Sequence, residues 1–174
     1  MGIASAFVKS LTPDQIVLEI TERSAARLTV VVREAQRLRT LGFALALDDA
    51  GSGNSGLEIL SQLDVDYVKI DREVIVRAQS RSGGRGVLAA IVAIAHAMGA
   101  QIIAEGIEDA QMLDLVMRAT HSSSIPAAVQ GYFLGRPSTG FVDAAQLAMV
   151  EDRLAASDLT RHQRIDAETS LVTS

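Results

Sequence analysis

Apolar residues follow two alternating patterns along this chain. Short runs rich in Val, Ile, Leu and Ala are apolar at successive positions, as in strands that a parallel sheet buries on both faces. The longer segments between them repeat apolar residues every three or four positions, which is typical of helices packed on a sheet. The expected strands are Ile16–Ile20, Phe43–Asp48, Tyr67–Ile70, Gln101–Glu105 and Ala128–Leu134, and the expected helices are Ala25–Leu41, Ser55–Leu63, Arg72–Gln79, Val87–Met98 and Asp109–Ala119.

The alternation of strands and helices predicts an α/β fold with a parallel sheet covered by helices. A complete (β/α)8 barrel has more units than the five expected here. Because only five units are expected and Met1–Lys9 is typical of the end of a helix, we expect a partial TIM-type barrel that lacks its first strands. This barrel domain would span residues 1–156, with a last helix at Asp143–Ala156, and residues 157–174 would form a flexible tail.

Glycine and serine mark the expected ends and connections. Gly42 and Gly99 directly follow helical patterns and suit left-handed caps at helix C-termini. The stretch Ser80–Gly86 contains three glycines and predicts a flexible surface loop, and His121–Pro126 predicts another.

Composition narrows the class of protein. The 174 residues suit one domain, and 48% hydrophobic with 21% charged residues is ordinary for a soluble globular protein. A net charge of −5 and the lack of a basic run argue against DNA or RNA as a partner. The absence of cysteine excludes disulfides and thiolate sites. With no convincing signal peptide, we expect a cytoplasmic protein.

One apolar stretch is long enough to cross a membrane. It runs over Val87–Ala104, but Gly99 divides it into a buried helix and a following strand. We therefore expect no membrane segment in this chain.

Acidic side chains stand at the ends of four expected strands. They are Glu19, the adjacent Asp48 and Asp49, Asp71, and Glu105. Barrel enzymes keep their active sites at the carboxyl ends of the strands, and carboxylates gathered there bind hard divalent cations. The pattern indicates metal-dependent chemistry.

Several residues that could carry chemistry also have simpler interpretations. A pair such as Asp48–Asp49 is, alone, more often a helix N-cap with a solvated neighbour. Lys69 alone would be a surface lysine, or the Schiff-base lysine of a barrel aldolase. The glycines of Gly51–Gly53 are too few for a dinucleotide-binding fingerprint. His96 has no second histidine at ligand spacing, so it predicts no histidine metal site.

Five short motifs, each weak alone, follow one another in an order that belongs to one family. They are Leu18–Glu22, Asp48–Ser55, Lys69–Asp71, Ala104–Glu108 and Gln130–Pro137. In these motifs the chain resembles the EAL-domain family, over roughly Leu11 to Phe141. Leu18–Glu22 looks like the family's third-strand motif, so the resemblance implies a barrel that begins at about the third strand. Members of that family are TIM-barrel phosphodiesterases that open cyclic di-GMP to linear pGpG with two Mg²⁺ or Mn²⁺ ions.

The resemblance implies metal ligands at three positions. Glu19 and Asp48 would bind the ions, with Asp48 bridging both, and Asp49 would bind the second ion. Two cations a few ångströms apart lower the pKa of a bridging water and stabilise both the attacking and the leaving oxygen of a phosphodiester.

The resemblance also implies roles for four further residues. Lys69 would orient or activate the attacking water, Glu105 would support the metal centre, and Gln130 would belong to the water network. Glu22 would not be catalytic, because its family role is to brace the loop after Asp49, which contributes to a homodimer. Fused or separate GGDEF or sensor domains are the partners that the family implies.

The chain departs from the family pattern in three respects. The interval from Glu105 to Gln130 is a few residues longer than expected, with a Ser-rich insertion at His121–Pro126. The family's Glu-Ala-Leu strand and the Asn of the following strand, both metal ligands, have no counterpart because they would precede Met1. In the loop after the paired aspartates, Ala50 replaces the expected Phe and Asn54 the expected Tyr. These departures leave two functions open: a cyclic di-GMP phosphodiesterase domain with impaired activity, or a non-catalytic module that binds cyclic di-GMP or a protein.

Overall fold

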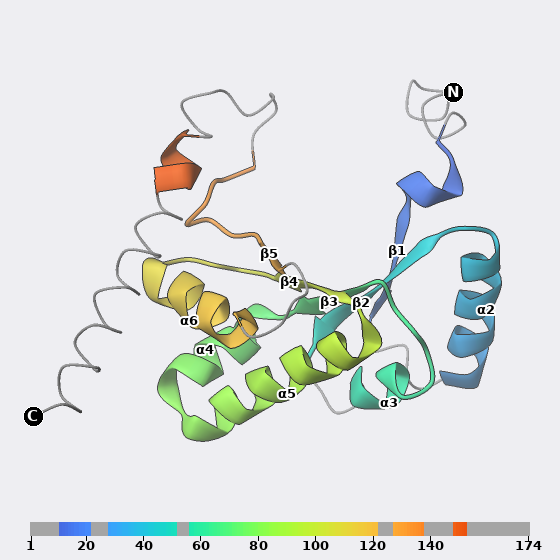
Figure 1. Ribbon diagram of the computed structural model, residues 1–174, viewed down its shortest axis with the longest axis horizontal. Helices are drawn as coiled ribbons and strands as arrows, with labels where there is room; N and C mark the ends of the chain where they lie inside the picture. Colours follow the sequence, from blue (N-terminus) through green and yellow to red (C-terminus); the bar gives the residue numbers. More distant parts are fainter. Residues whose placement is uncertain (1–10, 22–27, 52–55, 122–126, 138–147, 153–174) are drawn as a thin grey trace, which may run out of the picture.

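The computed structural model describes residues 11–21, 28–51, 56–121, 127–137 and 148–152. Its described part is built on a five-stranded sheet in which all neighbours are parallel and strand order follows the chain (Figure 1). Among these residues the sheet is open, with β1 and β5 as its edge strands. The strands are β1 (Val17–Thr21), β2 (Ala44–Ala50), β3 (Tyr67–Ile70), β4 (Gln101–Ala104) and β5 (Ala127–Val129).

Helices connect the strands, as parallel pairing requires. Figure 1 shows α4, α5 and α6 gathered below the sheet, where they contact one another, while α2 and α3 contact β2. The α/β architecture of barrel type predicted from the sequence is confirmed. The helices are α2 (Leu28–Thr40), α3 (Gly56–Leu60), α4 (Arg72–Ser80), α5 (Ser82–Met98) and α6 (Ala110–Thr120), and a short 3-10 turn, η1 (Pro13–Gln15), precedes β1.

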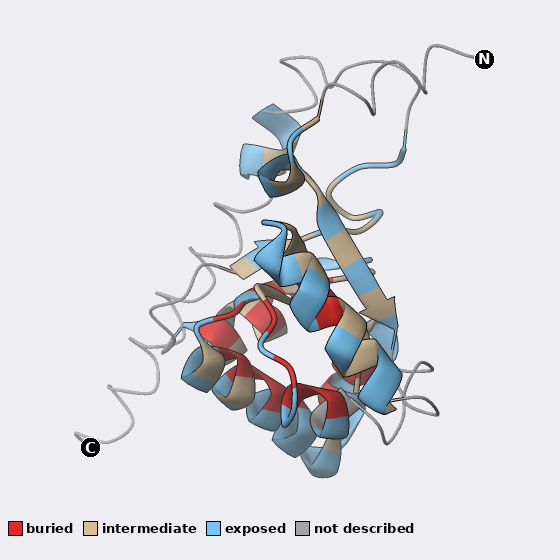
Figure 2. Ribbon diagram, turned by 90° about the vertical axis from the view of Figure 1, so that its right-hand side faces the viewer, coloured by how far each residue is buried: buried red, intermediate tan, exposed pale blue. Residues whose placement is uncertain are grey.

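The core lies between the sheet and these helices, where Figure 2 shows the buried residues. Alternate positions of the strands supply one side of it, and the inner faces of the helices supply the other. Burial of each large aliphatic side chain stabilises the fold by about 1.5–3 kcal/mol. The fully buried members include Leu45, Leu47, Val68, Ile70 and Ile102 from the sheet, and Ile75, Leu88 and Leu113 from the helices.

Several details of the sequence prediction are confirmed. Gly42 and Gly99 have left-handed φ angles of 93° and 72° at the ends of α2 and α5. The apolar stretch Val87–Ala104 divides at Gly99 into the end of α5 and strand β4. In the described parts of the chain, no helix is both long and apolar enough to cross a bilayer.

Two predictions of local structure are wrong. The stretch Ser80–Gly86 was expected to be a loop, but only Arg81 separates α4 from α5, which begins at Ser82. A side chain at Gly84 would overlap the carbonyl oxygen of Arg77, so this glycine lets the two helices approach closely. Close packing thus outweighs the low helix propensity of glycine.

The second wrong prediction concerns the strand expected at Ala128–Leu134. Strand β5 ends at Val129, and the chain then turns around Ile107. The Ile107 amide donates to the Gln130 carbonyl (3.0 Å), and the Ile107 carbonyl accepts from the Phe133 amide (2.9 Å). Gly131 permits this turn, because a Cβ there would overlap the Ile107 backbone.

The remaining predictions lie wholly or largely outside the described residues. They are the His121–Pro126 loop, the helix at Asp143–Ala156 and the tail 157–174. Of that helix, the structure describes residues 148–152, which are helical.

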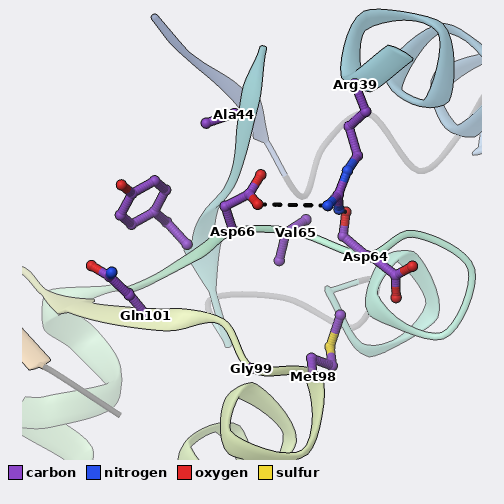
Figure 3. A pocket seen from close by; sticks show the side chains of 9 residues that line it. Arg39, Ala44, Asp64, Val65, Asp66, Met98, Gly99 and Gln101 are labelled. Carbon is purple, nitrogen blue, oxygen red and sulfur yellow. Dashed lines mark hydrogen bonds and ion pairs between the residues drawn. The ribbon is translucent and has the colours of Figure 1, made fainter. Parts of the chain in front are cut away.

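The end of the sheet where the strands begin depends on Asp66. Its carboxylate accepts a hydrogen bond from the Leu45 amide (2.8 Å) and lies 3.6 Å from the Arg39 guanidinium. Figure 3 shows this ion pair beside a cavity of about 340 Å³ lined by Met98, Gln101 and their neighbours. The Asp66 backbone also bonds Leu45 and Gln101, so one residue links β2, β3 and β4.

We predict that Asp66→Ala lowers the free energy of unfolding by about 1–3 kcal/mol, because the Leu45 amide loses its acceptor. The matched variant Asp66→Asn keeps an acceptor and should cost less. Chemical denaturation of the three proteins measures the difference. Equal stability of Asp66→Ala and the wild type would contradict this role.

We predict that Gly131→Ala destabilises the protein by about 1–3 kcal/mol, because a Cβ there would overlap the Ile107 backbone and force the turn to shift. The matched control is Gly86→Ala in α5, where a Cβ meets nothing within 4 Å. That control should raise stability by roughly 0.5–1 kcal/mol through helix propensity. Thermal unfolding compares them, and a neutral Gly131→Ala would contradict the packing described for the turn.

Candidate functional site

The strand register brings one predicted site residue from each of β1, β2 and β3 to the same face of the sheet. Glu19 lies opposite Ala46, and Ala46 lies opposite Tyr67. Asp48 and Lys69 stand two residues beyond these positions. Because side chains alternate between faces along a strand, Glu19, Asp48 and Lys69 all project away from the helix-covered core.

The same reasoning extends to the last two strands. Lys69 lies opposite Ile103, which lies opposite Ala128. Glu105 and Gln130 follow two residues later, just past the ends of β4 and β5. Five predicted site residues therefore meet at the carboxyl end of the sheet.

Asp49 sits in a β-bulge next to Asp48. Leu47 pairs with Val68 and Ala50 with Ile70, so β2 has one residue more than β3 over this interval. Asp49 takes a left-handed φ of 58°, a conformation that Asp tolerates better than most residues. The bulge interrupts the strict alternation of side chains, so two consecutive carboxylates can serve one site.

The Lys69 ammonium is surrounded by three carboxylates from three other strands or strand ends. Its Nζ lies 2.8 Å from Glu19 Oε1, 2.8 Å from Asp48 Oδ1 and 3.1 Å from Glu105 Oε1. Gln130 Nε2 donates to the same Glu105 oxygen at 3.2 Å. We call Glu19, Asp48, Lys69 and Glu105 the Lys69 cluster. When its acids are ionised, the cluster carries two negative charges in excess.

The surroundings of Lys69 fix its charge. Burial acts to lower the pKa of Lys69, but hydrogen bonds to Asp48, Glu19 and Glu105 outweigh burial and raise the pKa above its ordinary value. The side chain is therefore a permanent cation near neutral pH. Schiff-base chemistry needs the neutral amine, so this geometry argues against the aldolase alternative.

The buried Oδ1 of Asp48 already has a cationic partner. Among the described residues, this partner is the Lys69 ammonium at 2.8 Å. A hard divalent cation would interact with the same oxygen, because such ions prefer carboxylate ligands. The donor set fits Mg²⁺ or Mn²⁺ in kind, because it consists of carboxylate oxygens. In the described part of the chain, no group of three acidic or histidine side chains is already arranged to hold a metal ion.

A cavity of about 610 Å³ adjoins the site at Gln130. On its wall, Arg72 and Glu108 form a bidentate ion pair, with nitrogen–oxygen distances of 2.9 Å and 2.6 Å. The Arg72 guanidinium lowers the pKa of the Glu108 carboxyl. The Arg136 guanidinium lies 4.5 Å from the ring centre of Tyr132, within the range of a cation–π contact.

The sequence alone predicted no role for four residues that line this cavity, Arg72, Glu108, Tyr132 and Arg136. Two features of the sequence could have indicated them. Arg72 directly follows the Lys69–Asp71 motif, and Glu108 is the second acid of the Ala104–Glu108 motif. Gly106, at a left-handed φ of 65°, lies against the Arg72 side chain and makes room for it.

Two residues singled out in the sequence remain, Asp71 and Glu22. Asp71, which follows β3, accepts a hydrogen bond from the Glu73 amide and caps α4, as an Asp at a helix start often does. Glu22 lies outside the described residues, so its predicted bracing role stays a prediction.

Known proteins resemble this chain over most of its length. The probable cyclic di-GMP phosphodiesterase PdeG of Escherichia coli is 32% identical over 142 residues, which are 80% of this chain and 26% of PdeG. The cyclic di-GMP phosphodiesterase NbdA of Pseudomonas aeruginosa is 32% identical over 137 residues, 78% of this chain and 16% of NbdA. The chain thus spans about a quarter of PdeG and less of NbdA.

Solved structures show the same fold. The MucR phosphodiesterase in complex with c-di-GMP has a TM-score of 0.66 at 29% identity, covering 83% of this chain and 56% of that one. The manganese and cyclic di-GMP complex of Klebsiella pneumoniae BlrP1 has a TM-score of 0.64 at 28% identity, covering 77% and 33%.

A family model agrees with both comparisons. The model described as the EAL domain matches residues 2–137, which include every strand of the sheet and the whole Lys69 cluster. With relatives above 30% identity over most of its length, the chain belongs to the EAL domain family.

Proposed function

We propose that this chain acts as a cyclic di-GMP phosphodiesterase domain, which hydrolyses one phosphodiester bond to give linear pGpG. The observation that carries the proposal is the Lys69 cluster, with three carboxylates within 3.1 Å of one ammonium at the carboxyl end of a barrel-type sheet. Relatives described as cyclic di-GMP phosphodiesterases, and neighbours solved with cyclic di-GMP and Ca²⁺ or Mn²⁺, support it.

In this proposal Glu19, Asp48 and Asp49 hold two divalent ions, Mg²⁺ or Mn²⁺. Asp48 would be the central ligand, because its side chain is only 18% exposed and shares the Lys69 ammonium with Glu19 and Glu105. The bulge at Asp49 lets the second carboxylate serve the same site. When bound, such ions activate water and stabilise the charge that develops on a phosphodiester.

Lys69 supplies a fixed positive charge beside the reacting group. Its side chain is only 14% exposed, so its ammonium acts in a poorly solvated place where electrostatic interactions are strong. There it would orient the attacking water and offset phosphate charge. Glu105 and Gln130 would both hydrogen-bond this water. The Gln130 amide donates to the Glu105 carboxylate at 3.2 Å.

The adjoining cavity offers space for part of the nucleotide. Its volume of about 610 Å³ lies within the range of small-molecule sites. The guanidinium groups of Arg72 and Arg136 suit phosphate or guanine oxygens, and the exposed ring of Tyr132 suits stacking on a base.

We also propose that turnover by this chain alone is low, because the carboxylates that would hold the ions are engaged by Lys69. The homodimer, the fused or separate GGDEF or sensor domain, the domain boundary at residue 156 and the cytoplasmic location stay predictions. MucR, described as a bifunctional diguanylate cyclase and phosphodiesterase, is a precedent for a second activity in one chain.

We predict that the purified chain converts cyclic di-GMP to pGpG in Mn²⁺ and that chelation of the metal stops the reaction. Asp48→Asn should lower the rate by roughly 100-fold or more, because it removes a ligand charge while keeping the shape of the side chain. Chromatography of the products measures both effects. Turnover unchanged in Asp48→Asn would contradict the assigned site. Calorimetric binding of cyclic di-GMP by a folded sample without turnover would favour the non-catalytic module.

We predict that Asp49→Asn and Asp49→Ala lower turnover equally, because both remove the same charge. Their stabilities should differ, because Asn tolerates the left-handed φ of residue 49 whereas Ala loses roughly 1 kcal/mol there. Thermal unfolding and turnover are measured on the same preparations. Full activity in Asp49→Asn would exclude Asp49 as a ligand.

A further inference from the structure

The Lys69 ammonium occupies the place where the carboxylates of the site come together. It contacts one oxygen each of Glu19, Asp48 and Glu105, which come from three different segments of the chain. A divalent cation bound by Glu19 and Asp48 would need these same oxygens. The ammonium and the ion therefore cannot both keep their best contacts.

We propose that Lys69 is an internal counter-cation that holds the site carboxylates together when no divalent ion is bound and competes with the ion for their oxygens. The inference rests on the proposed function, since it takes Glu19 and Asp48 as metal ligands. Entry of an ion would require the ammonium to withdraw from Asp48 and Glu19. The released ammonium would then be available to a phosphate of the substrate, so that ion binding prepares Lys69 for its role.

The choice of residue supports this role. The chain has 16 basic residues, of which only Lys9 and Lys69 are lysines and the rest are arginines. An arginine would bind a carboxylate through a planar, bidentate fork, as Arg72 binds Glu108 here. The lysine ammonium is instead a compact point charge on a flexible stem, which can leave one set of partners for another.

The net charge of the Lys69 cluster also supports the counter-cation role. Three carboxylates around one cation leave two excess negative charges in a place where the Asp48 and Lys69 side chains are less than a fifth exposed. Without Lys69, the carboxylates repel one another at short range through a medium of reduced dielectric constant. The metal-free protein then loses stability, while its attraction for a divalent ion increases.

The test compares Mn²⁺ affinity in the metal-stripped full-length chain and its variants, measured from the electron paramagnetic resonance signal of free Mn²⁺. Lys69→Met should bind Mn²⁺ about tenfold more tightly than the wild type, or more, because the competing charge is gone. Lys69→Arg should bind it more weakly than the wild type, because a bidentate guanidinium leaves less readily. Arg77→Met makes the same change in net charge on the exposed side of α4 and should bind Mn²⁺ like the wild type.

A second readout is thermal unfolding with and without Mn²⁺. Lys69→Met should melt at a lower temperature than the wild type in chelator and gain more from added Mn²⁺. If Lys69→Met does not fold without metal, Lys69→Gln replaces it in both measurements, because its neutral amide can still donate a hydrogen bond to one carboxylate.

The outcomes separate this inference from the proposed function. Equal or weaker Mn²⁺ binding by Lys69→Met, with clear binding by the wild type, would overturn the counter-cation role and leave the metal site intact. Failure of every folded variant to bind Mn²⁺ would overturn both. The affinity order Lys69→Met, wild type, Lys69→Arg would support the competition.

Discussion

The parallel register of the five strands is the constraint on which this site depends. Each strand ends at the same edge of the sheet, and the pairing of Glu19 with Ala46 and of Lys69 with Ile103 decides which side chains share a face. A shift of one residue in any strand would turn its site residue toward the helix-covered core. The buried residues Leu45, Leu47 and Val68 oppose such a shift, because it would expose them. The core thus fixes the position of the polar site.

In the Lys69 cluster, attraction between opposite charges is set against the cost of removing those charges from water. Three carboxylates share one ammonium, and the side chains of Asp48, Lys69 and Glu105 are at most a fifth exposed. Such an arrangement contributes little net stability, because removing the charges from water is costly. The excess negative charge of the cluster suits the binding of a further cation. The bulge at Asp49, with its left-handed φ, adds to the cost and again coincides with the predicted ligands.

The sequence predicted the elements that a strong local pattern defines. The strands are recognisable because they are apolar on both faces, and the site residues because Glu19, Asp48 and Glu105 end or interrupt apolar runs where an unpartnered acid is costly. The glycine-rich start of α5 was missed, because its helical form depends on contact between Gly84 and α4. The turn after β5 was missed for a similar reason, since it is held by the Ile107 backbone. The Arg72–Glu108 pair joins residues far apart in sequence, and no periodicity indicates such a partner.

The most direct test of this account is the position of Mn²⁺ in crystals of the chain, located by its anomalous X-ray scattering. We expect Mn²⁺ within coordination distance, roughly 2 Å, of Asp48 and Glu19 oxygens, with the Lys69 ammonium withdrawn from both. Mn²⁺ bound elsewhere, or Lys69 still seated between Glu19 and Asp48 beside a bound ion, would contradict it.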